Sequence, residues 1–229
     1  MRPILPLNLS AFWVALACAT LLCILCLDRS VVLFFAAHDG LRRVFQACAA
    51  PSLLALPAAG LFLCWAALQK LSGVVRLNPL WLRVSLATLA ATAAKDELKW
   101  LFGRPWPETW LKHGLYSFHP LANSALYGGF PSGHTAYISA PLGVLWVLRP
   151  RWRPLYAAVI LGVMTGLVGA NYHFLSDVLG GLITGTACAW GTLVLLGPEK
   201  LHGLRAFYRT RLAAPNGAVF RVARRAPPV

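Results

Sequence analysis

The stretch YGGFPSGHTAYISAPLGVLWV, residues 127–147, combines two opposed features in one segment. Its second half is apolar enough to form part of a membrane-spanning helix. Its first half places Ser132, Gly133 and His134 where such a helix is expected to begin. A hydroxyl, a bare backbone and an imidazole are unusual at the start of a membrane helix. The sequence therefore predicts a membrane helix whose first turn has a chemical use.

The composition of the whole chain is that of a membrane protein. Of its 229 residues, 58% are hydrophobic and 12% are charged, whereas soluble domains carry about 25% charged residues. The formal net charge is +14, which suits either nucleic acid or anionic lipid head groups as a partner. Because the basic residues lie in loops and a tail beside apolar runs, we favour lipid head groups over nucleic acid.

Six apolar runs approach the roughly 20 residues that a membrane-spanning helix needs. They lie at residues 8–27, 51–69, 80–99, 132–148, 154–173 and 178–197. The stretch 38–48 differs, because apolar residues at helical spacing beside Arg42 and Arg43 predict a short amphipathic helix at the membrane surface. The predicted fold class is all-α: a polytopic membrane helical bundle with six transmembrane helices and an interfacial amphipathic helix.

The basic residues predict how the chain is divided and oriented. A six-span membrane domain, residues 1–197, precedes a basic tail, residues 198–229, and the first span is expected to be retained rather than cleaved as a signal peptide. Most of the 21 basic residues lie near the N-terminus, in the connections 70–83 and 149–153, and in the tail. Since basic connections remain in the cytoplasm, both termini are predicted to be cytoplasmic.

Glycines in the last two spans predict close helix packing. Gly162 and Gly166 form one pair of small residues four apart, and Gly181 and Gly185 form another. Such pairs let helix backbones approach closely in a membrane. We expect them to bring the fifth and sixth spans together.

Two cations lie at the end of the third span, in the stretch KWLFGRPWPETW, residues 99–110. Lys99 and Arg104 can simply anchor the span by extending to the head groups. They can also clamp a phosphoryl group, because arginine matches phosphate oxygens bidentately and lysine adds a point charge. Trp106 and Trp110 fit the aromatic belt at the membrane surface.

Two further polar clusters contain histidines. Ser132 and Gly133 begin the fourth span, where free N–H groups of a helix N-terminus can bind an anion, or where Ser132 is an ordinary helix cap. In NYHFLSD, residues 171–177, the Asp177 carboxylate can orient His173 and make its other nitrogen a better nucleophile. Alternatively, Asp177 caps the sixth span and His173 only lies at the membrane surface.

The predicted topology brings the three clusters to the outer side of the membrane. Together they supply two cations, a helix-end anion site, the free His134 and a carboxylate-supported His173. This set fits phosphoryl transfer through a phosphohistidine, which depends mainly on positioning and charge stabilisation. We expect no metal, since the sequence shows no compact acidic or Cys/His cluster to hold one.

The clusters resemble the motifs of the integral membrane branch of the phosphatidic acid phosphatase type 2 superfamily, also called lipid phosphate phosphatases. That family reads Lys-x6-Arg-Pro, then Pro-Ser-Gly-His, then Ser-Arg-x5-His-x3-Asp. Here PSGH matches in full at residues 131–134, and His-x3-Asp matches at His173 and Asp177. The resemblance covers about half of the chain and implies a six-span bundle with its site at one membrane face.

The chain departs from this pattern at two arginines. The arginine of the first motif falls on Trp106, and Arg104, two residues earlier, is expected to take its role. The arginine of the third motif falls on Leu167, and Asn171 or Tyr172 is a candidate neutral donor in its place. The predicted site is therefore one cation poorer than the family pattern.

The resemblance also implies a role for each site residue. His173 attacks phosphorus, Asp177 orients it and stabilises the imidazolium, and His134 protonates the leaving oxygen. Water then releases phosphate without a metal or another cofactor. The phosphoryl oxygens are held by Lys99, Arg104, Ser132 and the Gly133 N–H.

Three functions remain open at this stage. The first is metal-independent hydrolysis of a lipid phosphate or diphosphate at the outer membrane face. The second passes the same phosphohistidine to a lipid acceptor. The third is non-catalytic lipid binding or transport, which the missing arginine favours and the intact His134, His173 and Asp177 oppose. We predict the hydrolase, a multi-pass protein of a bacterial inner membrane with its site on the periplasmic side.

Overall fold

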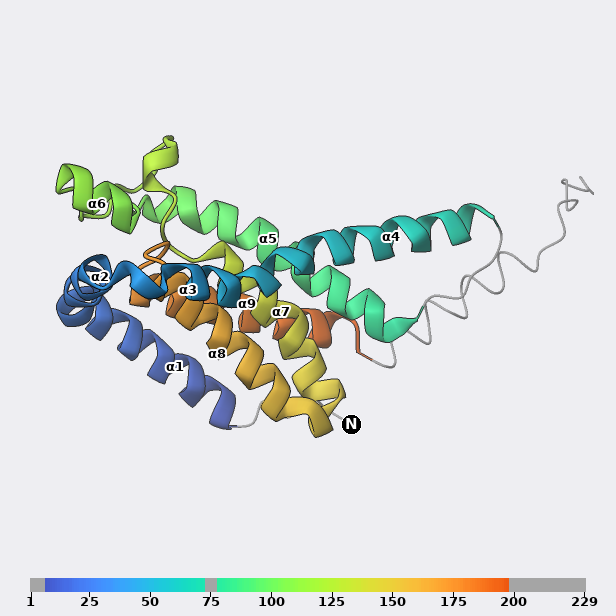
Figure 1. Ribbon diagram of the computed structural model, residues 1–229. Helices are drawn as coiled ribbons and strands as arrows, with labels where there is room; N and C mark the ends of the chain where they lie inside the picture. The colour runs from blue at the N-terminus through green and yellow to red at the C-terminus, as the bar shows by residue number, and fades with distance from the viewer. Residues whose placement is uncertain (1–6, 73–77, 198–229) are drawn as a thin grey trace, which may run out of the picture.

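The computed structural model describes residues 7–72 and 78–197, and these residues form helices and connecting loops with no β-strand. The all-α prediction is confirmed. The predicted basic tail, residues 198–229, lies outside the described residues. Figure 1 shows the helices gathered into a bundle, from which α4 extends at one end.

The first apolar run continues further than the sequence predicts. Helix α1 (Leu7–Leu22) passes through a π-helical turn (Cys23–Leu27) directly into α2 (Asp28–Ala37). Asp28 and Arg29 interrupt the apolar pattern, so the predicted span ends at residue 27. The helix continues because the Asp28 carboxylate is fully buried and paired with Arg104.

The predicted amphipathic segment at 38–48 forms helix α3 (Arg42–Ala49), preceded by a 3₁₀ turn (Asp39–Leu41). A second 3₁₀ turn (Ala50–Leu54) leads into α4 (Ala55–Leu71). The helix itself agrees with the prediction, and its place at a membrane surface remains a prediction.

Helix α7 (Gly133–Leu148) forms the centre of the bundle. On one side it packs against α5 (Pro79–Phe102) and α9 (Leu175–Leu195) in a cluster of small side chains that includes Ala87, Ala136 and Ala189. On the other side Ile138 packs with side chains of α8 (Arg153–Gly169) and α9. Small residues allow these helix backbones to approach closely.

The glycines pack other helix pairs than the sequence predicts. A Cβ atom at Gly181 would lie 2.5 Å from the Ser132 carbonyl oxygen, and one at Gly185 would lie 2.0 Å from Ser139 Oγ, so both glycines face α7. Gly166 faces α3, because its Cβ would lie 2.5 Å from the Phe45 carbonyl oxygen. Gly162 has nothing within 4 Å of such an atom. The prediction that both pairs join the fifth and sixth spans is therefore wrong.

Within residues 7–72 and 78–197, four helical segments are long and apolar enough to cross a membrane, namely Leu9–Ala37, Asp39–Gln69, Pro150–Gly169 and Leu175–Leu195. They contain or overlap four of the six predicted spans. The other two predicted spans form α5, with several charged residues near its end, and α7, with 16 residues. Leucines on the outside of the bundle are up to 84% exposed, as expected of a surface in contact with lipid.

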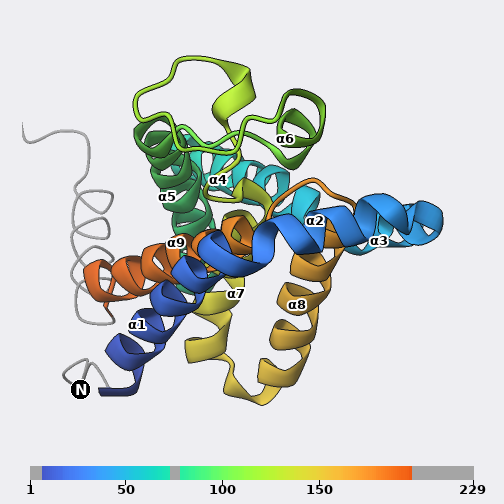
Figure 2. The ribbon, with the colours of Figure 1, turned by 90° about the vertical axis from the view of Figure 1, so that its left-hand side faces the viewer.

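The polar ends of three helices meet at one end of the bundle. The Ser132 N–H donates to the Asp177 carbonyl (3.0 Å), which joins the starts of α7 and α9. The Gly129 N–H donates to the Arg104 carbonyl (2.8 Å) just beyond the end of α5. Figures 1 and 2 show α6 (Pro107–His113) at this end and the connection between α7 and α8 at the opposite end. The predicted convergence of the three clusters is present in the structure.

Candidate active site

The loop between α5 and α7 is folded tightly against the end of α5. Gly103 ends α5 with a φ of 55°, and a Cβ atom there would lie only 1.7 Å from the His119 carbonyl oxygen. Only glycine fits this backbone and this contact. The His119 N–H donates to the Gly103 carbonyl at 2.8 Å, so the loop returns over the helix end before it reaches α7.

The residues predicted to bind an anion lie at the start of α7. Ser132 is the N-cap, and its hydroxyl oxygen accepts the Thr135 N–H at 3.4 Å. Gly133 is the first helical residue, and both Ser132 and Gly133 are buried. His134 follows in the first turn and is half-buried. The predicted cap is confirmed, and the histidine lies beside it.

The two histidines lie close together although they belong to different helical segments. The ring centroids of His134 and His173 are 6.3 Å apart. His173 is 1% exposed, and it lies two residues before the start of α9. A group held between the two imidazoles can therefore contact both.

Asp177 caps α9, as one of its two interpretations predicts, and it also lies near His173. One carboxylate oxygen, Oδ2, lies 3.5 Å from His173 Nδ1 and also accepts the Phe174 N–H at 2.9 Å. The side chain thus caps α9 and faces the histidine. Because Asp177 is fully buried, its charge acts on His173 without screening by water.

Arg104 does not lie where a phosphate-binding residue is expected. Its side chain is fully buried, with Nη1 2.6 Å from Asp177 Oδ1 and Nη2 2.7 Å from Asp28 Oδ2. Burial opposes the charge, but the two carboxylates more than offset it and raise the pKa of the guanidinium. The structure thus places this guanidinium among carboxylates behind the site, which differs from the predicted contact with phosphate.

Two members of this buried cluster, Asp28 and Ser176, are not predicted from the sequence. The Asp28 carboxylate accepts the Ser176 N–H at 2.9 Å and the Ser176 hydroxyl at 2.5 Å. Both residues are fully buried. The signal was an aspartate inside an apolar run, because ionisable residues at such positions face the bundle interior and often have a function.

Trp106 occupies the place of the absent arginine in the first motif. Its ring centroid lies 5.0 Å from that of His173 and 4.9 Å from Lys99 Nζ. Its indole N–H donates to the Ala125 carbonyl at 2.8 Å, which fixes the ring against the loop. Trp106 therefore lies between Lys99 and His173, a contact that the prediction of an aromatic belt misses.

The replacements expected for the second arginine point elsewhere. Leu167, at the place of that arginine, is fully buried in the core beside α8 and α9. The Asn171 amide donates to the Val32 carbonyl at 3.2 Å, and the Tyr172 hydroxyl accepts from Gln46 at 2.9 Å. These two side chains are directed toward α2 and α3, so neither is placed as the predicted neutral donor.

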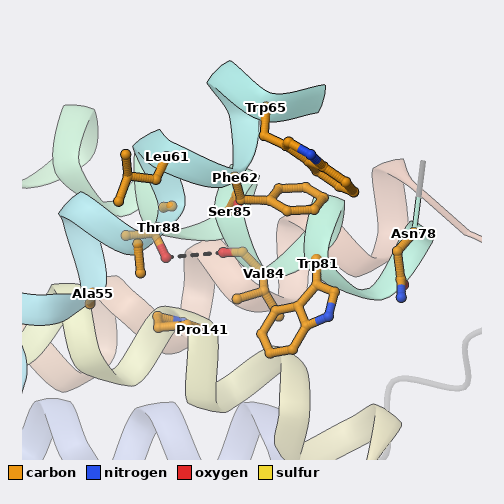
Figure 3. Close-up of a pocket in the computed structure, with 12 residues that line it drawn as sticks. Ala55, Leu61, Phe62, Trp65, Asn78, Trp81, Val84, Ser85, Thr88 and Pro141 are labelled. Atoms are coloured by element: carbon orange, nitrogen blue, oxygen red, sulfur yellow. Dashed lines mark hydrogen bonds between the residues drawn. The ribbon is translucent and has the colours of Figure 1, made fainter. Parts of the chain in front are cut away.

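One cavity lies beside Lys99, and another lies along the bundle. One, of about 230 Å³, is lined by Lys99 and by residues 122–125, 127 and 128 of the loop. The other, of about 710 Å³, is mostly apolar and lies between α4, α5 and α7. Figure 3 shows Phe62 and Trp65 of α4 facing Trp81 and Val84 of α5 across it.

Among the described residues, no cluster of three or more His, Cys, Asp or Glu side chains is arranged to hold a metal.

The chain was compared with known proteins. The family model of the PAP2 superfamily matches residues 80–200. The lipid A 1-phosphatase of Rhizobium johnstonii is 35% identical over 99 residues, 42% of this chain and 38% of that protein. The lipid A 1-phosphatase of Rhizobium etli is 37% identical over 90 residues, 38% of each chain. The match thus spans about two fifths of these relatives, and no solved structure matches the chain significantly.

Proposed function

This chain belongs to the PAP2 superfamily, and we propose that it hydrolyses a lipid phosphate through a phosphohistidine at His173, without a metal. The observation that carries the proposal is the pair of imidazoles 6.3 Å apart, one of them 3.5 Å from a buried carboxylate. A nucleophile supported by a carboxylate and a second group able to move a proton are the parts that this reaction needs.

The first step transfers the phosphoryl group to the protein. His173 Nε2 forms a bond to phosphorus while the bond from phosphorus to the lipid oxygen breaks. The negative charge of Asp177 Oδ2, 3.5 Å from His173 Nδ1, favours the tautomer with its proton on Nδ1. His134 gives its proton to the leaving oxygen, and the lipid leaves as an alcohol.

The second step restores the protein. Water attacks phosphorus, the bond to His173 Nε2 breaks, and His134 takes the proton of the attacking water. Inorganic phosphate is released. The same two imidazoles therefore serve both half-reactions in opposite directions.

Buried charges behind His173 favour the phosphorylated state. Asp28 and Asp177 carry two negative charges, and Arg104 carries one positive charge between them. The net charge of this buried set is negative. It stabilises the positive charge that develops on the His173 ring as its nitrogen bonds to phosphorus.

The phosphoryl oxygens are held on the other side of the ring. We assign Lys99, the Ser132 hydroxyl and the Gly133 N–H to these contacts. Ser132 and Gly133 begin α7, and Lys99 contacts Trp106, which lies beside His173. Arg104 is not among them, since both of its terminal nitrogens face carboxylates. A helix N-terminus favours an anion through its free N–H groups and its dipole.

A lipid substrate is supported by three observations. The outer surface of the bundle is rich in exposed leucine, and the apolar cavity between α4, α5 and α7 is large enough for part of an acyl chain. Both matched relatives are lipid A 1-phosphatases. The proposed substrate is therefore a lipid phosphate such as the 1-phosphate of lipid A. In this proposal the protein is a six-span bundle in a bacterial inner membrane, and the substrate enters the site from the outer face of that membrane.

The test uses purified protein in detergent with a chelator and a panel of lipid phosphates and diphosphates. We expect phosphate release by the wild type and its loss in His173→Ala, with full activity in the control His38→Ala, which changes an exposed histidine at the end of α2. Release that persists in His173→Ala removes this residue from the mechanism.

Two alternatives are outcomes of the same assay. Label that moves from one lipid to another, without free phosphate, identifies a phosphotransferase. Binding of a lipid phosphate without any turnover identifies a lipid-binding protein, which the replacement of two family arginines by Trp106 and Leu167 favours.

A further inference from the structure

We propose that Lys95 is a second phosphate-contacting cation of this site and, together with Lys99, compensates for the two absent arginines. The inference rests on the proposed function, because it assumes that a phosphoryl group binds at the start of α7. Its basis is a deficit of positive charge and the placement of a lysine that no motif includes.

The predicted site residues supply too little positive charge for a phosphoryl group. A phosphomonoester carries about two negative charges at neutral pH. Trp106 and Leu167 stand where the family pattern has arginine, and the Arg104 guanidinium is enclosed by carboxylates. Among the predicted site residues this leaves Lys99 to face the phosphoryl group. One ammonium group is a weak partner for a dianion.

Lys95 lies on the same face of α5 as Lys99. The two residues are four apart in one helix, so their side chains project from neighbouring turns about 6 Å apart along the axis. The Lys95 side chain is only 13% exposed, which is low for a lysine. It is therefore packed into the bundle rather than extended into solvent.

The Lys95 side chain runs along the first turn of α7. A Cβ atom at Gly133 would lie 3.1 Å from Lys95 Cδ, so the lysine stem passes directly beside the proposed anion site. Lys95 Nζ lies 5.6 Å from the centroid of Tyr137, one turn further along α7, whose ring is 6.2 Å from that of His134. The charges of both lysines are close enough to act on the His134 imidazole.

The present partner of the ammonium can be exchanged. Lys95 Nζ is paired with the carboxylate of the adjacent Asp96, which is 60% exposed. An ion pair with so exposed a partner contributes little to stability. A phosphoryl group at Gly133 offers the ammonium more charge and several acceptor oxygens, so Lys95 turns from Asp96 to the substrate.

The test compares Lys95→Gln and Lys95→Arg with Asp96→Asn and with Lys112→Gln. Lys112 is the matched control, since it is an exposed lysine of α6 whose partner Glu108 is also exposed. Two quantities are measured for each variant: kcat/KM on a lipid phosphate and the inhibition constant of inorganic phosphate. Melting temperatures show whether each variant is folded.

We expect Lys95→Gln to weaken inhibition by phosphate and to lower kcat/KM, each by about tenfold or more, the effect of losing one charge-assisted hydrogen bond. Lys95→Arg keeps most of both values, and Lys112→Gln changes neither. Asp96→Asn leaves phosphate inhibition unchanged or strengthens it, because it frees the ammonium.

Two results overturn the inference while the proposed function stands. In the first, Lys95→Gln matches an active wild type in both quantities. In the second, Asp96→Asn loses as much as Lys95→Gln, which shows that the lysine acts only through its ion pair. If the wild type hydrolyses no lipid phosphate, the proposed function fails separately. Lys95 is then judged by the rise of the melting temperature in inorganic phosphate, which Lys95→Gln should abolish.

Discussion

Arg104 carries a buried positive charge between two buried carboxylates, those of Asp28 and Asp177. A third partner, the Ser176 hydroxyl, contacts both the guanidinium and Asp28. Removing one member of such a cluster leaves the others buried without their counter-charge. The cluster therefore joins α2, the end of α5 and the start of α9, and it fixes the carboxylate that faces His173.

Arg104→Met should lower the free energy of unfolding by about 3–5 kcal/mol, because it leaves two unpaired carboxylates in the interior. The measurement is thermal or denaturant unfolding in detergent, with Arg43→Gln as the control, since Arg43 is an exposed arginine of α3. Equal stability of the two variants would show that Arg104 is not needed to neutralise the cluster.

At the scale of helices, the contact between α7 and α9 positions the site. Gly181 and Gly185 bring α9 against the first turns of α7. The Ser132 N–H then reaches the Asp177 carbonyl at 3.0 Å. The anion site and the carboxylate are thus held by one helix contact that only small residues permit.

Gly181→Ala should disturb this contact, because the added Cβ would lie 2.5 Å from the Ser132 carbonyl oxygen and 2.8 Å from Thr135 Cβ. Such overpacking costs about 1–3 kcal/mol, and the shift of Ser132 should also lower phosphate release. Unfolding and activity are measured beside Gly162→Ala, whose Cβ would meet nothing within 4 Å. If both glycine variants behave alike, α7 and α9 are not held together at Gly181.

The sequence predicted the positions of the helices better than it predicted their ends and their packing partners. Hydrophobic runs gave the existence and approximate place of the main helices, and motif spacing gave His134, His173 and Asp177. The continuation through Asp28 was missed because its counter-charge, Arg104, is distant in the sequence. The packing of Gly166 on α3 was missed because a small residue shows that a neighbour is close without showing which helix it is.

For the whole molecule, a group of arginines lies at the end of the bundle opposite the site. The site and α6 lie at one end, whereas Arg149, Arg151 and Arg153 lie at the connection between α7 and α8 at the other. The start of α5 is at this second end as well, since Arg83 Nε donates to the Leu196 carbonyl beside the end of α9 (2.9 Å). Basic connections favour the cytoplasmic side.

Single cysteines should report this orientation in a background without the native cysteines. Asn123→Cys, in the loop near the site, is expected to react with an impermeant maleimide in intact cells. Arg151→Cys, at the opposite end, is expected to react only after the membrane is opened. The reverse pattern of labelling would place the site in the cytoplasm.

The pocket could be predicted as a set of residues but not as a set of roles. Motif spacing gives Ser132, Gly133 and Lys99 their places because each lies at a helix end. Arg104 and Trp106 are only two residues apart yet differ in surroundings, since the loop turns Arg104 inward to Asp177 and leaves Trp106 beside His173. Which side chain faces the substrate depends on the conformation of this loop, and the spacing of the motif residues does not predict that conformation.

The most direct test of the account is to trap phosphate on the protein during turnover. Protein and a lipid with labelled phosphate are mixed, quenched in base within milliseconds to seconds, digested and sequenced by mass spectrometry, since a phosphohistidine survives base and is lost in acid. We expect acid-labile label on His173 in the wild type and none in His173→Ala. Turnover by the wild type with no label on His173, or with label on another residue, would contradict it.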